Sequence, residues 1–333
     1  MGKVMMLAGG EYIYWNSVLI AAGALAAALM AVALRLWKGE RLLPMLLALP
    51  IAGLLGLYAA RLLHWYCRYE SYESLAAALG DLRGGGWSLM GAFAGGLLAF
   101  ALLRLLRLTD NLPALLDRAA PAAALGVAVG RLGDLFTTAD RGKMLFASEA
   151  LHRLPYASAV ANTASGALEW RFAVFCAQSI WAAVIFFILL LRTLLPRRAL
   201  ARRPEWADGG VFFLFLQLYC SGQIVTDSAR YDALFLRSNG FVSLEQIVCA
   251  VCLAAVLAIY SVRSVRAHGW RWYHPVCWAV ALLGLGLTGF MEYYVQRHGD
   301  EYVFAYGMMI EGLLIFFCAT CAMLRSTQKR ADP

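Results

Sequence analysis

Nine apolar runs, each about long enough to cross a bilayer, divide the sequence. They span residues 14–35, 43–63, 86–106, 112–136, 171–192, 210–229, 241–262, 275–295 and 303–324. A helix needs roughly 20 apolar residues to cross the hydrocarbon core, because each residue advances it by only about 1.5 Å. With 62% hydrophobic and 15% charged residues, the 333-residue chain has little sequence left for a separate aqueous domain. We therefore predict an all-α integral membrane protein with about nine transmembrane helices.

Positive charge gathers in alternate connections between these runs. The basic residues that follow the first, third, fifth, seventh and ninth runs are Arg35, Lys38, Arg41, Arg104, Arg107, Arg192, Arg197, Arg198, Arg202, Arg203, Arg263, Arg266, Arg271, Arg325, Lys329 and Arg330. Basic residues near the ends of membrane helices favour the cytoplasmic side. We therefore predict an extracytoplasmic N-terminus and a cytoplasmic C-terminus. The net charge of +8 is then a topology signal, and we expect no nucleic-acid partner.

Two connections on the predicted outer side are long. Residues 64–85 mix Trp and Tyr with charged residues, which is typical of a short amphipathic helix lying at the headgroups. Residues 137–170 are polar and rich in Ala and Ser. We expect residues 137–170 to form a small extracytoplasmic head.

Arg131 and Glu311 are charged residues that lie inside apolar runs and need a physical explanation. Arg131 falls within about a turn of the outer end of the fourth run, where an arginine costs a few kcal/mol unless it snorkels, pairs or faces a polar cavity. Gly126, Gly130 and Gly133 leave room there for a ligand or a neighbouring backbone. Arg131 is therefore either an interfacial arginine that snorkels to the headgroups or part of an anion-binding site. Glu311, in the ninth run, is either neutral and hydrogen-bonded between helices or part of a functional site.

The eight cysteines show no disulfide framework. Cys249 and Cys252, like Cys318 and Cys321, have CxxC spacing, but both pairs lie among Ala, Leu and Phe. This environment favours apolar packing over redox chemistry or metal binding. We expect no metal site and no cofactor.

Three segments resemble motifs of the prolipoprotein diacylglyceryl transferase family, the membrane enzymes that lipidate bacterial lipoproteins. They are residues 59–62 (AARL), 82–99 (LRGGGWSLMGAFAGGLLA) and 115–136 (LLDRAAPAAALGVAVGRLGDLF). The corresponding family motifs are ARL, GGMSFHGG and DLIAPALPLGxxxGRxGNF. A weaker match covers residues 210–230 (GVFFLFLQLYCSGQIVTDSAR), which is similar to GxxFxLFLxxYGxxRFxxExxR with Tyr219, Asp227 and Arg230 in register.

The resemblance covers roughly residues 13–262 and implies a seven-helix transferase-like domain over residues 1–262. Residues 263–333 then form an added two-helix extension. The implied protein lies in the bacterial inner membrane. Its implied reaction moves a diacylglyceryl group from phosphatidylglycerol to the cysteine thiol of an exported lipoprotein precursor. The implied partners are an anionic phospholipid and that precursor.

Several positions depart from the family pattern. Met90 stands where the family has the His of its HGG segment, and Gln223 stands where it has the Arg of YGxxRF. Asp134 replaces the Asn after GRxG, and Ala139 replaces the Glu five residues later. The HPSQLYE run corresponds to residues 172–178, FAVFCAQ. These departures leave open a second hypothesis, a catalytically silent relative that binds lipid or serves as a scaffold.

The family reaction needs cationic donors for the lipid phosphate. Arg131 is the best candidate, because a guanidinium can hold two phosphate oxygens at once. Arg61 and Arg230 would complete the clamp, unless they are interfacial arginines that snorkel, and we assign Gln223 and Ser88 to the same lipid-binding set.

The reaction also needs a group that deprotonates the thiol. Tyr219, Gln223 and Asp227 are spaced so that they share one helix face, where they either line a cavity or hold two helices together. We expect Tyr219 and Asp227 to act in catalysis with Arg131 and Asp134.

Met90 cannot accept a proton, so the base would be Asp134, Asp227, His64 or His152, or the thiolate would come from solution. Asp134 follows Arg131 by three residues, so an ion pair between them is an alternative to a catalytic role.

Overall fold

The computed structural model describes residues 4–8, 11–81, 85–109, 111–142, 149–161, 167–194, 208–236, 241–298 and 301–327. Nine helices of 17 or more residues lie within these ranges: α1 (Trp15–Trp37), α2 (Leu43–Cys67), α4 (Leu89–Leu105), α5 (Leu112–Gly130), α6 (Val174–Leu194), α8 (Gly210–Ser228), α9 (Leu244–His268), α10 (Tyr273–His298) and α11 (Tyr302–Ser326). Each coincides with one of the nine predicted runs. The prediction of an all-α membrane protein is confirmed.

Seven of the segments in these ranges are long and apolar enough to cross a membrane. They are α1, α2, α5 together with the 3-10 turn η2 (Arg131–Phe136), α6, α9, α10 and α11. Helices α4 and α8 are not among these seven segments. Helix α4 is apolar but has only 17 residues, and α8 has 19 residues.

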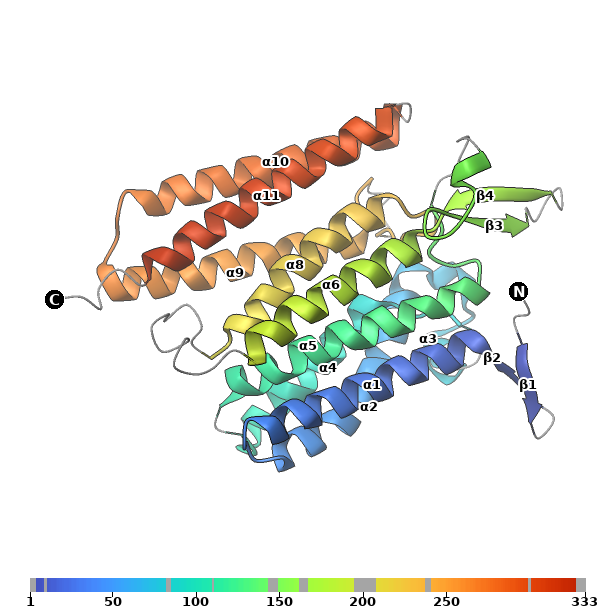
Figure 1. Cartoon of the computed structure of the whole chain (residues 1–333), viewed down its shortest axis with the longest axis horizontal. Helices are drawn as coiled ribbons and strands as arrows, with labels where there is room; N and C mark the ends of the chain where they lie inside the picture. The colour runs from blue at the N-terminus through green and yellow to red at the C-terminus, as the bar shows by residue number, and fades with distance from the viewer. Residues whose placement is uncertain are drawn as a thin grey trace.

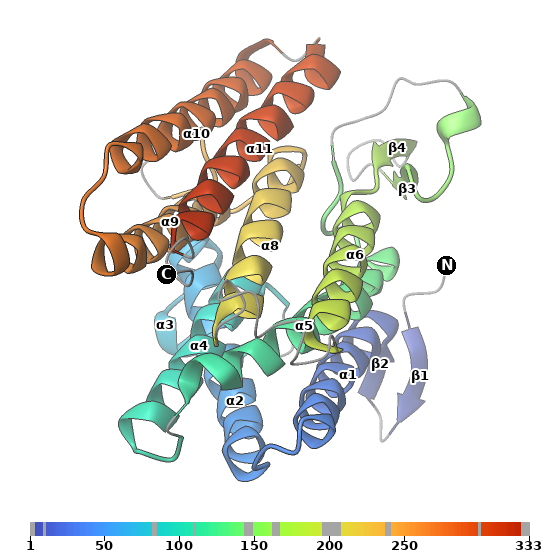
Figure 2. The ribbon, with the colours of Figure 1, turned by 60° about the vertical axis from the view of Figure 1, so that its left-hand side comes forward.

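The long helices run side by side in one bundle, as Figure 1 shows. Helices α10 and α11 pack on each other and cover α9 and α8 on one flank, whereas α1 and α2 lie on the opposite flank. The view turned by 60° separates the α10–α11 pair from α5 and α6 (Figure 2). The C-terminal pair therefore extends the bundle beyond α9.

Glycine allows two helix pairs to approach closely. A Cβ atom on Gly91 of α4 would lie 2.5 Å from the carbonyl oxygen of Ala59 and 2.6 Å from the Cα of Ala60, both on α2. A Cβ on Gly23 of α1 would lie 2.6 Å from the carbonyl oxygen of Gly126 on α5. Only glycine fits at such separations, because any side chain would collide with the neighbouring backbone.

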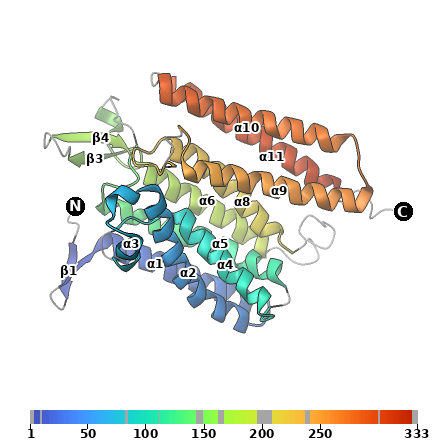
Figure 3. The ribbon, with the colours of Figure 1, turned by 180° about the vertical axis from the view of Figure 1, so that it is seen from behind.

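The polar connections gather at one end of the bundle. Strands β3 (Ala157–Ala161) and β4 (Leu168–Phe172) form an antiparallel hairpin there, inside the predicted head, and β1 (Val4–Ala8) pairs with β2 (Glu11–Tyr14) at the same end (Figure 3). Residues 143–148 and 162–166 of the predicted head lie outside the described residues. The all-α prediction did not include these two hairpins.

The predicted interfacial segment contains a short helix, as expected. Helix α2 continues to Cys67, and only η1 (Tyr69–Ser71) and α3 (Leu75–Gly80) follow it. Residues 82–84 lie outside the described residues.

Glu311 is exposed on α11 and forms no hydrogen bond with another helix in the described part of the chain. The alternative of an interhelical hydrogen bond at Glu311 is therefore wrong.

Candidate functional site

Arg131 lies where helix α5 ends and η2 begins. It is the C-terminal cap residue of α5, and the chain tightens into a 3-10 turn from this residue onward. Gly133 lets this turn approach α1, because a Cβ there would lie 2.5 Å from the side-chain oxygen of Asn16. The space that the sequence suggested for a ligand beside Gly126 and Gly133 is filled by the backbone of α1.

Asp140 connects two arginines that are distant in sequence. Its carboxylate forms a close ion pair with Nη1 of Arg131, and its other oxygen lies 2.7 Å from Nη2 of Arg230. Asp134 lies 3.7 Å from Nη1 of Arg131. The predicted helical pairing of Arg131 with Asp134 is thus present, but Asp140 is the closer partner. The Nε of Arg131 has no hydrogen-bond partner among the residues that the structure describes.

Asp140 was missed by the sequence reasoning. Fixed spacing from the GRxG motif placed the family's acidic position at Ala139, whereas the carboxylate that contacts Arg131 belongs to the next residue. Asp140 has a φ of +51°, a left-handed conformation that Asp adopts more readily than most residues. Its side chain is 4% exposed. The sequence feature that could have identified Asp140 was an acidic residue within a few positions of the one expected from the motif.

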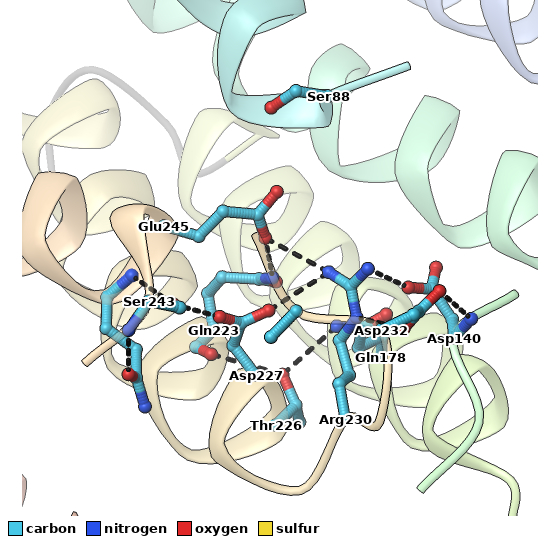
Figure 4. A network of polar contacts seen from close by, with 12 residues as sticks. Ser88, Asp140, Gln178, Gln223, Thr226, Asp227, Arg230, Asp232, Ser243 and Glu245 are labelled. Atoms are coloured by element: carbon cyan, nitrogen blue, oxygen red, sulfur yellow. Dashed lines mark hydrogen bonds and ion pairs between the residues drawn. The ribbon is translucent and has the colours of Figure 1, made fainter. Parts of the chain in front are cut away.

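Arg230 is surrounded by carboxylates (Figure 4). Besides Asp140, its guanidinium lies 3.0 Å from Asp227, 3.1 Å from Asp232 and 3.2 Å from Glu245. Burial lowers the pKa of Arg230, but the neighbouring carboxylates outweigh this effect and hold its pKa above the usual value. Arg230 therefore stays charged and fixes the ends of α8 and α9 against the segment that carries Asp140.

The predicted polar face of α8 joins this network. Gln223 donates a hydrogen bond of 3.0 Å to Glu245 on α9, and the Ser243 hydroxyl donates a short hydrogen bond to Asp227. Tyr219, one turn earlier, is 5% exposed, and its hydroxyl has no hydrogen-bond partner in the described chain. Tyr219 interacts electrostatically with Arg131 and Glu245. The face therefore holds α8 to α9 and leaves one buried hydroxyl unpaired.

Arg141 is a buried cation that the sequence reasoning did not single out. Its guanidinium carbon lies 4.3 Å from the ring centroid of Phe175, and its Nη2 donates to the carbonyl oxygen of Thr137 at 3.0 Å. Within the part of the chain that the structure describes, its Nε and Nη1 have no hydrogen-bond partner, although the residue is only 4% exposed. Burial lowers the pKa of Arg141, and the nearby Asp134 partly offsets this. Unpaired donors on a buried guanidinium provide a place for an anion.

Arg61 and Ser88 belong to a different part of the structure. Arg61 is fully buried and donates to the carbonyl oxygens of Ala78 at 2.6 Å and Gly86 at 3.0 Å. Ser88 caps α4 by accepting from the N–H of Gly91, and it lies apart from the carboxylate network in Figure 4. These contacts fix the segment between α2 and α4.

The residues considered as bases have different surroundings. Met90 packs in the apolar core, His64 hydrogen-bonds with Tyr72 at 2.8 Å, and His152 stacks on Trp170 in the head at 4.9 Å between ring centroids. Among the described residues, no group of three or more His, Cys, Asp and Glu side chains could hold a metal ion.

The chain is similar to known transferases over most of its length. Residues 3–262 match the prolipoprotein diacylglyceryl transferase family. A phosphatidylglycerol–prolipoprotein diacylglyceryl transferase of Trichormus variabilis is 29% identical over 261 residues, which cover 77% of this chain and 88% of that protein. Proteins of the same name are 26% identical over 272 residues in Geobacillus kaustophilus (80% of this chain, 94% of that protein) and 30% identical over 217 residues in Frankia alni (62% and 52%). The family match covers well over half of the residues of this chain, so the chain belongs to the prolipoprotein diacylglyceryl transferase family.

Proposed function

We propose that this protein is a bacterial inner-membrane transferase that moves a diacylglyceryl group from phosphatidylglycerol to the cysteine thiol of a lipoprotein precursor. Family membership and the names of its relatives support this activity. They also favour it over a catalytically silent lipid-binding relative. For the site, the main supporting observation is that the Asp140 carboxylate forms ion pairs with both Arg131 and Arg230.

The lipid phosphate would bind at Arg131 and Arg141, two guanidiniums with unpaired donors on the α5–α6 connection. The Nε of Arg131 and the Nε and Nη1 of Arg141 lack hydrogen-bond partners among the described residues. Charge-assisted bonds to a phosphate oxygen strengthen when water is excluded, because the local dielectric is low. In this arrangement Asp140 and Arg230 position Arg131, and the lipid phosphate contacts Arg131 and Arg141.

Asp134 is the best-placed base. Its side chain is 14% exposed, whereas that of Asp227 is fully buried against Arg230 and Ser243. A base must reach the proton that it removes, so an accessible carboxylate is favoured. Asp134 would take the thiol proton, and the thiolate sulfur would attack the glyceryl carbon that carries the phosphate. A carbon–sulfur bond then forms, and the carbon–oxygen bond breaks as glycerol phosphate leaves with the electron pair.

The proposed orientation puts this site at the extracytoplasmic side. Strand β1 and the end of α11 lie at opposite ends of the bundle (Figure 1), which supports termini on opposite sides of the membrane. The basic residues of the connections favour an extracytoplasmic N-terminus and a cytoplasmic C-terminus.

Complementation tests the activity. Cells depleted of their own transferase should regain lipid-modified lipoproteins when they express this protein, and Arg131→Ala should abolish the rescue. Arg266→Ala, an exposed residue of α9, is the matched control and should rescue fully. A folded, membrane-inserted wild-type protein that neither rescues nor transfers labelled phosphatidylglycerol in vitro would contradict the proposal and favour a lipid-binding role.

A further inference from the structure

A cavity lies at the end of the bundle opposite to the Arg230 network. It has a volume of about 240 Å³ and opens between α6, α8, α9 and α11. Its lining includes Arg192, Leu214, Gln217, Phe317 and Arg325. The network around Arg230 lies where α8 ends, whereas this cavity lies where α8 begins.

Gln217 points to a missing ligand in this cavity. It is 3% exposed, and neither the oxygen nor the nitrogen of its side-chain amide has a hydrogen-bond partner among the described residues. Burying an unpaired amide costs on the order of 1–3 kcal/mol by protein mutational data. The large majority of buried polar side chains in folded proteins are paired. A polar group that enters the cavity would supply the missing partner.

The cavity also combines cationic and apolar walls. Arg192 lies in the last turn of α6 and Arg325 in the last turn of α11, so two guanidiniums from different helices line one opening. Leu214 and Phe317 add apolar surface. Basic pockets between membrane helices on the cytoplasmic side are suited to phospholipid headgroups.

We propose that this cavity binds an acidic phospholipid of the inner leaflet, at a site separate from the transfer site. The lipid phosphate lies between Arg192 and Arg325, a glycerol ester oxygen accepts a hydrogen bond from Gln217, and an acyl chain runs along Phe317. Helix α11 lies beyond residues 3–262, the part of the chain that matches the family, so the family match does not account for this site. The proposal does not depend on transfer activity.

Native mass spectrometry of the full-length protein in detergent tests the site, with phosphatidylglycerol as the probe. Gln217→Leu and Arg325→Ala should each weaken binding of one phosphatidylglycerol molecule at least about tenfold, since each removes a donor to that lipid. Arg266→Ala, an exposed basic residue in the last turn of α9, should bind as the wild type does. Phosphatidylcholine should bind more weakly than phosphatidylglycerol in the wild type.

Cross-linking separates this site from the transfer site. A photoactivatable phosphatidylglycerol should label peptides of α11 and of the first turns of α8, and this labelling should disappear in Gln217→Leu while labelling near Arg131 remains. Unchanged binding and labelling in both variants would overturn the proposal. Inorganic phosphate that displaces the lipid from this site, with no preference for phosphatidylglycerol over phosphatidylcholine, would assign a free phosphate instead and contradict the lipid.

Discussion

The side-chain amide of Gln246 on α9 donates a hydrogen bond of 3.0 Å to the carboxylate of Glu292 on α10. Gln246 belongs to the part of the chain that matches the family, whereas Glu292 belongs to the C-terminal pair. The side-chain amide oxygen of Gln246 accepts a hydrogen bond from the backbone N–H of Ser243, and the Ser243 hydroxyl donates to Asp227. Helix α10 is therefore connected through hydrogen bonds to the carboxylates around Arg230.

This connection predicts that the C-terminal pair stabilises the site. Glu292 is 3% exposed, so Glu292→Ala leaves one N–H of Gln246 without its partner and should cost about 1–3 kcal/mol of folding stability. Thermal unfolding in detergent and the rate of lipid transfer should both fall. Glu311→Ala on α11 removes an exposed carboxylate and is the control. Equal effects of the two substitutions would contradict a specific role for Glu292.

Arg131 should not be replaceable by lysine. A lysine keeps the charge but cannot present the planar pair of donors that binds Asp140 and a phosphate together. Removing a donor that stabilises developing charge costs about 100-fold or more in rate. Transfer of labelled phosphatidylglycerol should therefore fall by at least that factor in both Arg131→Lys and Arg131→Ala. A lysine variant with wild-type activity would show that charge alone suffices.

Asp140 should matter more for stability than Asp232, although both contact Arg230. The Asp140 side chain is 4% exposed and bridges two arginines, whereas that of Asp232 is 36% exposed and contacts one. Asp140→Asn should lower the unfolding free energy by up to about 3 kcal/mol, because it removes the buried negative charge that Arg131 and Arg230 share. Thermal unfolding of Asp140→Asn and Asp232→Asn in the same detergent checks the difference, and equal melting temperatures would refute it.

The close contact of α2 with α4 gives a prediction that does not depend on catalysis. Gly91→Ala should destabilise the protein by about 1–3 kcal/mol, because the added methyl group would overlap the backbone of Ala59 and Ala60. Gly96→Ala, on the same helix, has nothing within 4 Å of the added atom and is the matched control. Melting temperatures should separate the two variants, and a stable Gly91→Ala protein would mean that the helices can move apart.

The helices could be predicted because the membrane sets their length. Each apolar run of about 20 residues became a helix, and most ends differ by only a few residues. The connections were harder to predict, since no such constraint acts on them. The β3–β4 hairpin was not predicted, and the interfacial segment after α2 forms only the short elements η1 and α3.

Residues of the candidate site could be singled out where they belong to a motif on a helix. Arg131, Gln223, Asp227 and Arg230 were proposed in this way, and the structure connects them in one network of ion pairs and hydrogen bonds that includes Asp140 and Glu245. Asp140 and Glu245 were missed, because their contacts arise from the tertiary fold rather than from spacing along one helix.

Arg61 was also singled out from a motif on a helix, but it lies outside this network. It was grouped with the phosphate-binding arginines from its motif, but its described contacts fix the segment between α2 and α4.

Arg141 gives the sharpest test of the proposed phosphate site. Arg141→Met keeps much of the side-chain volume and the contact with Phe175 but removes the two unpaired donors, together with the hydrogen bond to the carbonyl oxygen of Thr137. If these donors bind the lipid phosphate, the KM for phosphatidylglycerol should rise about tenfold or more. The melting temperature should hold or increase, because a buried cation without a carboxylate within ion-pair distance in the described chain destabilises the fold. Arg171→Met, in the head, removes an arginine that pairs with Glu169 at 3.0 Å and is the control, with an unchanged KM. A purely structural Arg141 would give the opposite pattern, a lower melting temperature with an unchanged KM.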